Sequence, residues 1–350
     1  MHSIEIGGRT IGQGASPYII AEAGSNHNGD LDMAKRLVDV AASAGADAVK
    51  FQTFRAEEVY VKNSGTTTYL DEERSIYEII EEMEMPYEWI PKLAEYCRSH
   101  GVDFLSSATD ERSLDIVADH APALKIPSYT MSHHEFLDYV ATFDLPVIMS
   151  TGAHSFDEIR EAVDQISDAG VADLVVLHCV AAYPAPIDAI NVRVIKRIRS
   201  EFDVHSGLSD HTLDPTVAPC AATALRSAII EKHFTLDRSM QGPDHQSSLE
   251  PAELNEMITA VRNTWKALGS SGRPVYEIEK ELHDVARRRI HATTDISAGE
   301  TFNRENTGVL RSGERSNGLV PKHYSKILGR TASRDIESGT GITWDHITDS

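Results

Sequence analysis

The sequence has few cysteines and no long apolar run. Its 350 residues include only Cys97, Cys179 and Cys220, which are odd in number, widely spaced and without the spacing of zinc ligands. This usage is typical of reduced thiols in a cytoplasm and does not indicate a disulfide framework. No window reaches the length of a membrane span, and no basic region followed by an apolar run opens the chain. We therefore expect a cytoplasmic protein without a transmembrane helix or a signal peptide.

Basic residues are scarce relative to acidic ones. Lysine and arginine total 33 against 54 aspartates and glutamates, which gives a formal net charge of −21. This acidity argues against nucleic acid or an anionic membrane surface as the main partner, because both require a positive footprint. A small anionic substrate is still compatible, since one pocket can be locally basic. The composition, with 41% hydrophobic and 25% charged residues, is that of a soluble globular protein long enough for two domains.

Short apolar runs alternate with helical patterns over about the first 270 residues. A helix is predicted from Asp30 to Gly45, another from Ser155 to Gly170, and a last one ends at Gly269. Eight strand-then-helix units favour a (β/α)₈ TIM barrel. A doubly wound open sheet is the competing fold, but no G-x-G-x-x-G follows the first strand. The eight predicted strands begin near Pro17, Ala46, Val102, Ala123, Leu145, Asp173, Val204 and Ala228.

The alternation of strand and helix patterns ends near residue 270, where S-S-G-R-P-V-Y-E is typical of a linker. We predict a catalytic barrel over residues 1–270, a linker over 271–286 and a small β-rich domain over 287–350. Two pieces of this last domain share the pattern D-I-x-x-G, which indicates an internal pseudo-repeat. The segment between Gln52 and Pro91 is longer than an ordinary βα loop, and we expect it to form an insertion over the barrel mouth.

Polar residues follow nearly every predicted strand, and in a TIM barrel the active site lies at those strand ends. Two lysines with several hydroxyls suit an anion such as phosphate plus carboxylate. His211 and His233, from adjacent strand ends, suit a divalent metal with open positions, such as Mn²⁺. In chain order the strand ends supply Glu22, Lys50, Gln52, Ser106, Ser107, Lys125, Ser128, Ser150, Thr151, His178, Tyr183, Ser209, Asp210, His211, Glu231 and His233.

Each of these residues, taken singly, has a simpler explanation. A lysine at a strand end is often a solvated charge, a lone histidine often makes a structural hydrogen bond, and Ser150 or Thr151 could cap the next helix. Their coincidence at successive strand ends favours a functional site instead. In the last strand Glu231 faces the same way as His233, whereas Lys232 faces the other way and has no assigned role.

Seven motifs spread along the chain carry a family resemblance. They are I-I-A-E-A-G-S-N-H-N-G-D (19–30), A-G-A-D-A-V-K-F-Q-T-F (44–54), S-I-Y-E (75–78), L-S-D-H-T-L (208–213), I-I-E-K-H-F-T-L-D-R (229–238), G-P-D-H (242–245) and S-L-E-P-x-E-L (248–254). Together they resemble the sialic acid synthase family, whose members condense phosphoenolpyruvate with an N-acylated hexosamine to give a nonulosonic acid. The segment from about 287 is similar to that family's antifreeze-like (SAF, β-clip) domain. The resemblance implies a TIM barrel followed by a SAF domain, and a transferase that forms a C–C bond.

The resemblance also implies roles for individual residues. His211 and His233 match the family's two metal ligands, and the implied metal is Mn²⁺, with Mg²⁺ or Co²⁺ as alternatives. Glu22 matches an acidic group near the reacting carbons, and Tyr183 and Asp244 match positions on the sugar side. The positions that bind phosphoenolpyruvate are matched by Lys50, Gln52, Ser107, Lys125, Ser128, Ser150 and Ser209.

Arg311, in V-L-R-S-G-E-R-S-N-G, matches the arginine that the family's C-terminal domain delivers into the active site of the partner subunit. The resemblance therefore implies a domain-swapped homodimer. It also gives a reason for the small domain, which would complete the mouth of another barrel.

The chain departs from the family pattern in three places. Tyr129 and Thr130 stand where the family reads G-E after the fourth strand, and Ala181 replaces a polar residue that is often asparagine. Residues 106–109 read S-S-A-T where the family has S-T-P-F. These changes cluster on the sugar and loop side, so they bear on the acceptor sugar more than on the reaction.

Three functions are therefore open. The first is an N-acylneuraminate synthase that uses an N-acylated hexosamine such as N-acetylmannosamine. The second is a legionaminic or pseudaminic acid synthase that uses a 6-deoxy-diacetamido hexose. The third is a barrel that binds a sugar or an anion without condensing it, a hypothesis supported only by the polarity lost at Thr130 and Ala181.

Overall fold

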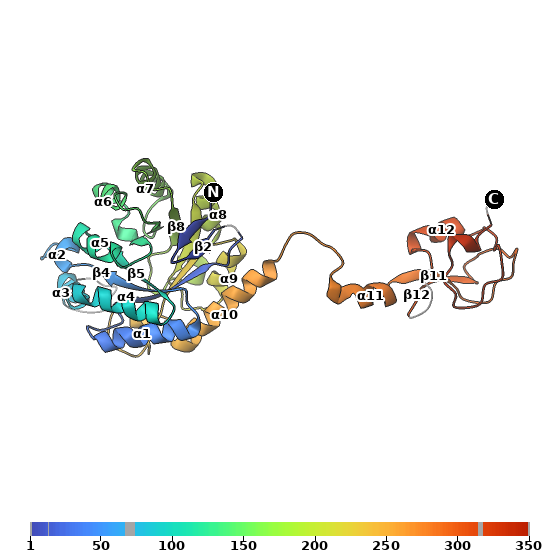
Figure 1. The fold of residues 1–350 in the computed structure, drawn as a ribbon, viewed down its shortest axis with the longest axis horizontal. Coiled ribbons are helices and arrows are strands. Elements are labelled where there is room, and N and C mark those ends of the chain that lie inside the picture. The colour runs from blue at the N-terminus through green and yellow to red at the C-terminus, as the bar shows by residue number, and fades with distance from the viewer. Residues whose placement is uncertain (1, 13, 67–73, 314–317, 349–350) are drawn as a thin grey trace. The chain divides into compact units, whose positions relative to one another are not determined.

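The computed structural model describes residues 2–12, 14–66, 74–313 and 318–348, and its chain divides into two compact units, Met1–Gly269 and Ser270–Ser350. Figure 1 shows both units. Part of the Arg311 motif, residues 314–317, lies outside the described residues, as do residues 67–73 of the predicted insertion.

Within the described residues of the first unit, eight parallel strands close into a barrel in the order β10-β3-β4-β5-β6-β7-β8-β9. The TIM barrel predicted from the sequence is thereby confirmed. Most of these strands are rich in apolar residues because a parallel sheet in this fold is buried on both faces. The strand β9 is mostly polar in sequence, and all of its residues are nevertheless buried. They are β3 (Tyr18–Gly24), β4 (Ala48–Thr53), β5 (Asp103–Ala108), β6 (Leu124–Ile126), β7 (Val147–Ser150), β8 (Leu174–Cys179), β9 (His205–Asp210) and β10 (Ile229–His233).

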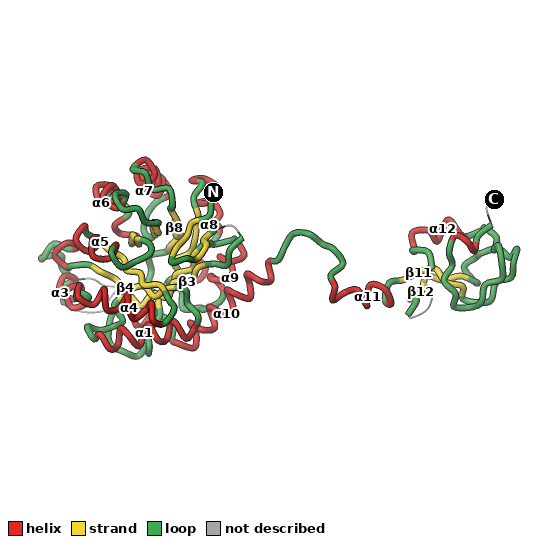
Figure 2. Tube along the Cα trace, in the orientation of Figure 1, coloured by secondary structure: helices red, strands yellow, loops and turns green. Residues whose placement is uncertain are grey.

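Helices surround these strands, as the red and yellow tube of Figure 2 shows. The predicted helix starts are confirmed: the Asp30 side chain accepts hydrogen bonds from the first turn of its helix, and Ser155 forms a capping box with Glu158. Gly45 ends the first helix with φ 86°, a conformation that favours glycine. The helices are α1 (Leu31–Ala44), α2 (Ala56–Val59), α3 (Ile76–Glu82), α4 (Ile90–Ser99), α5 (Glu111–Ala118), α6 (His134–Val140), α7 (Phe156–Asp168), α8 (Arg193–Phe202), α9 (Val217–Ala224) and α10 (Pro251–Leu268).

A short antiparallel hairpin, β1 (Ile4–Ile6) and β2 (Arg9–Ile11), precedes the barrel and was not predicted from the sequence. Its turn is Gly7-Gly8, and both glycines have positive φ, which a type I′ turn requires. The hairpin isoleucines are buried in the main core, so the hairpin packs against the barrel. Each strand has only three residues, which is too short for a strand pattern to be recognised in the sequence.

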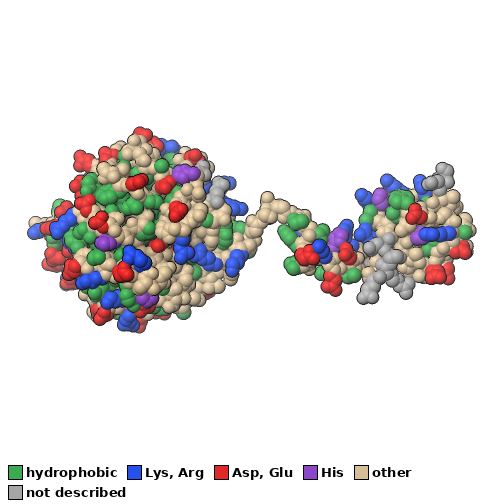
Figure 3. All heavy atoms as spheres, viewed as in Figure 1, with side chains coloured by type: hydrophobic (Ala, Val, Ile, Leu, Met, Phe, Trp, Pro, Cys, Tyr) green, Lys and Arg blue, Asp and Glu red, His purple; other side chains and the backbone are tan. Residues whose placement is uncertain are grey.

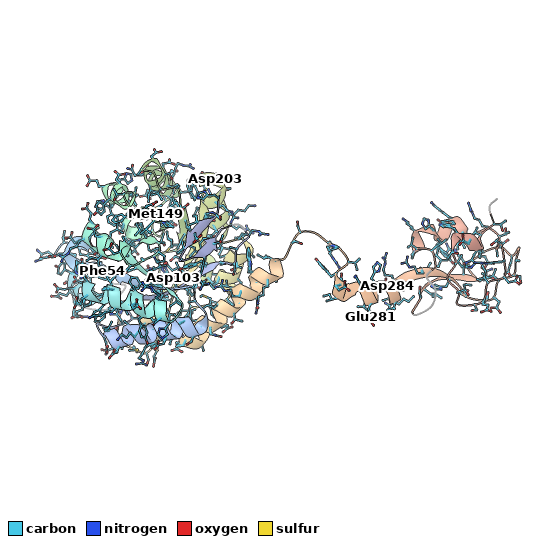
Figure 4. All side chains as sticks on the ribbon, viewed as in Figure 1. Phe54, Asp103, Met149, Asp203, Glu281 and Asp284 are labelled. Carbon is cyan, nitrogen blue, oxygen red and sulfur yellow. The ribbon has the colours of Figure 1, made fainter. Side chains whose placement is uncertain are left out.

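The long segment after β4 contains α2, α3 and the 3₁₀ turn Tyr87–Trp89. Arg55 organises its base: the guanidinium donates to the carbonyl oxygens of Phe54 and Met85, and lies 3.6 Å from the centre of the Tyr87 ring. Phe54 itself directly follows β4 and is marked in Figure 4. That this segment covers the barrel mouth remains a prediction.

The described residues contain no helix that combines the length and the apolarity of a membrane span. Cys97 and Cys179 are buried, Cys220 is half-buried, and all three are free thiols. The cytoplasmic location expected from these thiols remains a prediction.

The second unit contains the helices α11 (Lys280–Val285) and α12 (Tyr324–Ile327) and the antiparallel pair β11 (Arg288–Ala292) and β12 (Thr307–Arg311). The predicted linker therefore ends in a short helix, on which Glu281 and Asp284 are exposed (Figure 4).

The predicted pseudo-repeat pairs with itself. Ile296 and Ile336 exchange both backbone hydrogen bonds. Asp295 Oδ1 accepts from the backbone N–H of Ser338 at 2.8 Å, and Asp335 Oδ1 accepts from that of Ala298 at 2.7 Å. Each aspartate thus bonds to the third residue after the aspartate of the other copy, which gives this small core an approximate twofold symmetry.

Candidate active site

The last barrel strand, β10, changes character along its length. Ile229 and Ile230 are fully buried core residues, and the strand then carries Glu231 and His233 on its inner face. His233 is paired in register with Glu22 of β3, and Glu231 with Ser209 of β9. The ends of neighbouring strands therefore place these polar groups side by side at the C-terminal mouth of the barrel.

Four buried charged residues, Glu22, Lys50, Lys125 and Glu231, meet at this mouth and form what we term the charged cluster. Lys50 Nζ lies 2.9 Å from Glu22 Oε1 and 3.8 Å from Glu231 Oε1. Lys125 Nζ approaches Glu231 Oε1 from another strand, at 3.9 Å. All four side chains are nearly inaccessible to solvent, and buried charges persist only when they are paired in this way. The alternation of the strand predicted only that Glu231 faces the same way as His233, whereas the structure makes it the shared partner of both lysines.

Neutral side chains orient the charged cluster. Gln52 Nε2 donates to Glu22 Oε1 at 3.0 Å, and Ser209 Oγ donates to Glu231 Oε1 at 3.0 Å. Lys125 Nζ donates to Ser150 Oγ at 2.8 Å. Ser150 therefore does not cap the following helix, and Thr151 does not either, because Ser155 is the N-cap of α7.

The pKa values of the two carboxyl groups in the charged cluster are shifted in opposite directions. Burial raises the pKa of Glu22 to about 7, although Lys50 acts in the opposite direction. Burial alone would also raise the pKa of Glu231, but Lys125 and Lys50 together hold it below its usual range. Glu231 is therefore a carboxylate at neutral pH, whereas Glu22 can carry or release a proton there.

The pKa values of the two lysines are also shifted in opposite directions. Burial lowers the pKa of Lys125, and the carboxylate of Glu231 only partly offsets this. For Lys50 the effect of burial is outweighed by Glu22 and Glu231, so its pKa is raised. One oxygen of each carboxyl, Glu22 Oε2 and Glu231 Oε2, is buried and has no hydrogen-bond partner within the described residues. These atoms are free to meet a substrate.

His211 and His233 lie beside one another, with 5.4 Å between their ring centres. His211 Nδ1 lies 2.8 Å from the carbonyl oxygen of Val180, so it donates there and leaves Nε2 as the free lone pair. His233 Nδ1 is buried and has no partner in the described part of the chain. Burial lowers the pKa of His233, which keeps the imidazole neutral, the form that binds metals.

This donor set fits a divalent metal held by two imidazoles. Among the described residues, no group of three His, Cys, Asp or Glu side chains surrounds one point, so the two imidazoles are the donors that the structure brings together. A metal here would keep several positions open for substrate and water.

The side of the mouth assigned to the sugar is lined by Tyr183 and Asp244. The Tyr183 ring lies over His211, with 4.2 Å between ring centres. Asp244 Oδ2 is buried without a partner in the described residues and would lie 2.8 Å from a Cβ atom on Gly24. Gly24, with φ 54°, is therefore a residue at which a side chain would collide with the site. Asp244 follows β10 by a loop, so only the sequence motif, and no strand pattern, could have located it.

The remaining predicted residues fall into two groups. Ser107 pairs in register with Gln52 and Lys125 and so lies on the inner face, and Ser128 Oγ accepts from the backbone N–H of Gly152 at 2.9 Å. Arg311, by contrast, is exposed at the end of β12 in the second unit, and the site described above is built entirely from the first unit.

His178 and Ser106 are not part of this mouth. His178 Nε2 lies 2.6 Å from the carbonyl oxygen of Ile190, and Ser106 Oγ lies 2.7 Å from Thr53 Oγ1, on the opposite face of the strands. The simpler explanation, a structural hydrogen bond, therefore holds for these two residues.

Lys232, which had no predicted role, ties the His211 loop to β10. Its Nζ donates to Asp210 Oδ2 at 2.6 Å, to Thr212 Oγ1 at 3.0 Å and to the carbonyl oxygen of Asp214 at 3.2 Å. The signal was present in the sequence: Asp210 and Lys232 each precede a candidate metal ligand on adjacent strands, and the two are paired in register.

Comparisons with known proteins identify the family to which both units belong. Residues 37–273 match the NeuB family, and residues 287–348 match the SAF domain. The spore coat polysaccharide biosynthesis protein SpsE of Bacillus subtilis is 42% identical, covering 99% of this chain and 98% of that protein. The N,N'-diacetyllegionaminic acid synthase of Legionella pneumophila is 36% identical and covers 96% of each chain. The crystal structure of the N-acetylneuraminic acid synthetase of Leptospira borgpetersenii with citrate is similar, with a TM-score of 0.73 and 31% identity over 81% of this chain and 95% of that one.

Proposed function

The chain belongs to the NeuB family, and from that premise we propose that it is a nonulosonic acid synthase that condenses phosphoenolpyruvate with an N-acylated hexosamine and releases phosphate. The observation that carries this proposal is the charged cluster: two buried lysines, held by two buried carboxyls, face a barrel mouth that also presents two imidazoles. The enzyme class is a transferase that forms a C–C bond.

The two lysines suit the phosphate and carboxylate of phosphoenolpyruvate. Lys50 and Lys125 come from β4 and β6 and are separated by the carboxylate of Glu231, so each can contact a different anionic group. Ser150 and Gln52 lie beside them as neutral hydrogen-bonding groups. Fixed charges of this kind stabilise the charge that develops during reaction, because no solvent has to reorganise.

In the proposed reaction, C3 of phosphoenolpyruvate forms a bond to the aldehyde carbon of the open-chain sugar, and the aldehyde oxygen takes up a proton. A water molecule adds to C2 and gives up a proton, and the resulting tetrahedral carbon expels phosphate to leave a ketone. The balance is phosphoenolpyruvate, aldehyde and water going to a 2-keto acid and phosphate.

Glu22 is the residue that we assign to proton transfer in this sequence. Its pKa of about 7 lets it accept a proton from the adding water and return one near neutral pH. Gln52 and Lys50 both bond to its Oε1 atom, which leaves the unpartnered Oε2 to face the reacting groups.

His211 and His233 would hold the divalent metal, for which we propose Mn²⁺, with Mg²⁺ or Co²⁺ as alternatives. When bound, such an ion supplies Lewis-acid polarisation of a carbonyl group. The Val180 carbonyl keeps His211 in the required tautomer, and Tyr183 covers the ring.

Two acceptor classes are distinguished by the rim of the mouth. N-acetylmannosamine is our first candidate, as the general acceptor of an N-acylneuraminate synthase. One observation favours the second, a 6-deoxy-diacetamido hexose: Tyr129 is 65% exposed and its hydroxyl neighbours that of Tyr183, so the rim is aromatic where the family pattern has glycine and glutamate. Aromatic faces suit the apolar methyl groups of such a sugar.

We further propose a homodimer in which Arg311 of each subunit completes the mouth of the other. In the single chain the second unit exposes large apolar side chains, with Ile278 91% and Leu282 65% accessible, and Leu310 next to Arg311 also exposed. Exposed apolar side chains on one segment are typical of a surface that another chain covers.

The test is phosphate release from phosphoenolpyruvate by the full-length protein, with a panel of N-acyl hexosamines, with and without Mn²⁺ and a chelator. We expect release that depends on acceptor and metal, and that is lost in His233→Ala and Lys125→Gln but retained in Lys35→Gln, a control on α1. Absence of release with every sugar would favour the barrel that only binds. Release that survives chelation or the His233 substitution would contradict the metal role.

A further inference from the structure

A second cavity, of about 140 Å³, lies at the end of the barrel where the strands begin. Its wall includes Ser206 near the start of β9 and Ala228 just before β10, together with Arg199 of α8 and Trp265 of α10. The charged cluster follows the other ends of the same strands. From Ser206 to Asp210 the strand advances about 13 Å, so this basal cavity is separate from the candidate active site.

The basal cavity is basic and lacks acid. Arg199, Arg226 and His205 line it, and no carboxylate among the described residues does. This is unusual in a chain with 54 acidic and 33 basic residues, whose visible surface in Figure 3 carries both signs intermingled. Arg199 is half-buried and Arg226 is exposed, so the cavity presents two cations without a carboxylate in its lining.

The two arginines are held together without a carboxylate partner. Arg199 Nη1 donates to the carbonyl oxygen of Arg226 at 2.9 Å, and the Arg226 guanidinium lies 5.9 Å from the centre of the Trp265 ring. Within the part of the chain that the structure describes, neither guanidinium forms an ion pair. Burial and the neighbouring Arg226 charge lower the pKa of Arg199, as expected when two cations approach each other.

Ser206 adds an unsatisfied hydroxyl to the same wall. The residue is 1% exposed, and its Oγ has no hydrogen-bond partner among the described residues. A buried hydroxyl without a partner costs free energy, so its retention calls for a ligand or a water molecule that would satisfy it. Ser206 is one of the residues that line the same cavity as the two arginines.

The loop that borders the cavity is shaped by glycine. Gly12 has φ 117°, and a Cβ atom there would lie 2.3 Å from His205 Cε1, so no larger residue fits. His205 itself is fixed, because its Nε2 lies 2.6 Å from the carbonyl oxygen of His2. The basal cavity is therefore bounded by residues that have little freedom to fill it.

We propose that the basal cavity is a binding site for a small tetrahedral oxyanion, with inorganic phosphate as the representative ligand. Guanidinium groups bond to phosphate oxygens in pairs, and a hydroxyl supplies one more donor. The cavity is smaller than the roughly 300 Å³ at which sites for drug-sized ligands begin, so it suits an ion rather than a whole sugar acid.

The experiment is isothermal titration calorimetry of the full-length protein with phosphate at constant ionic strength. The wild type is compared with Arg199→Gln, Arg226→Gln, Ser206→Ala and the control Lys196→Gln, which removes an exposed charge from the same helix as Arg199. We expect each arginine substitution to weaken binding about tenfold, the loss of one charge-assisted contact, with Ser206→Ala weaker than wild type and Lys196→Gln unchanged.

A further variant separates this site from the proposed reaction. Lys125→Gln disables the charged cluster, and phosphate binding that depends on Arg226 is expected to persist in it. The proposal is overturned if Lys125→Gln removes all phosphate binding, if Lys196→Gln weakens binding as much as Arg226→Gln, or if acetate binds as tightly as phosphate. Replacement of phosphate by sulfate is expected to preserve the pattern, because sulfate shares its geometry.

Discussion

Glu231 shows how much of the site depends on one side chain. Its Oε1 atom is the shared partner of two lysines from different strands and accepts a hydrogen bond from Ser209. The period-2 alternation of a strand predicted that Glu231 faces inward with His233. It could not predict that both lysines converge on it, because β4, β6 and β10 meet only when the barrel closes.

We predict that Glu231→Gln lowers kcat/KM for phosphate release by about 10²–10³-fold, the usual effect of losing a fixed charge that acts in the transition state. Glutamine keeps the size of the side chain but leaves Lys125 without its carboxylate and Lys50 with only that of Glu22. Glu256→Gln, an exposed change on α10, is the control. If the two variants retained equal activity, the charged cluster would not be the centre of the reaction.

His27, in the first motif, gives a prediction about stability and pH. It is almost fully buried, and its Nδ1 accepts a hydrogen bond from the backbone N–H of Gly29 at 3.1 Å. Burial lowers the pKa of His27 from 6.5 to about 4. Between these two pH values the unfolded chain binds a proton that the folded chain does not. The contribution of His27 to the free energy of unfolding is therefore complete above pH 6.5 and is lost as the pH falls toward 4.

The expected loss from this one group is about 2 kcal/mol between pH 8 and pH 5. Urea unfolding of the wild type and His27→Gln at both pH values would measure it, with the variant losing that much less stability. Equal losses in the two proteins would show that His27 titrates normally in the folded state.

At the scale of elements, most of the barrel was predictable, because strand ends, caps and apolar runs are local signals. Asp30 and Ser155 mark helix starts, and the end of β10 marks the site. The hairpin before the barrel was missed because its strands are short. The basal cavity could not be predicted, because it depends on loops and helices that are distant in sequence.

The contact between Lys232 of β10 and Asp210 of β9 holds the loop that carries His211. Both side chains are buried, and the Lys232 ammonium also bonds to Thr212 and to the Asp214 carbonyl. We predict that Lys232→Met destabilises the protein by about 3–5 kcal/mol, since it leaves Asp210 charged, buried and unpaired.

A double-mutant cycle checks this assignment. Lys232→Met with Asp210→Leu is expected to recover much of the lost free energy of unfolding, because both charges are then absent, while activity stays low because the His211 loop has lost its tie. Lys92→Met, an exposed change on α4, is the control. Strict additivity of the two single substitutions would mean that the pair is not coupled.

In the whole molecule, the second unit has its own small core and carries Arg311 at the end of β12. Its pseudo-repeat was predictable from the pattern D-I-x-x-G. A domain-swapped dimer and an unswapped dimer predict different activities when subunits of two variants are mixed.

We predict that Arg311→Ala and His233→Ala are each inactive alone but complement one another when co-expressed. In a swapped hybrid dimer, one barrel keeps its histidine and receives an intact arginine from the other subunit. Random pairing makes half of the dimers hybrids, each with one working site, so about a quarter of wild-type phosphate release is expected. No recovery in verified hybrids would rule out the exchange of Arg311 between subunits.

The reaction that we propose for this barrel joins phosphoenolpyruvate to an N-acylated sugar. The most direct test is mass spectrometry of the products formed by the full-length protein with Mn²⁺, phosphoenolpyruvate, and either N-acetylmannosamine or a diacetamido-6-deoxyhexose. The account predicts one new compound whose mass is that of an acceptor plus one pyruvate unit, formed in step with phosphate. Phosphate released while both acceptors stay unchanged, or no reaction with either, would contradict it.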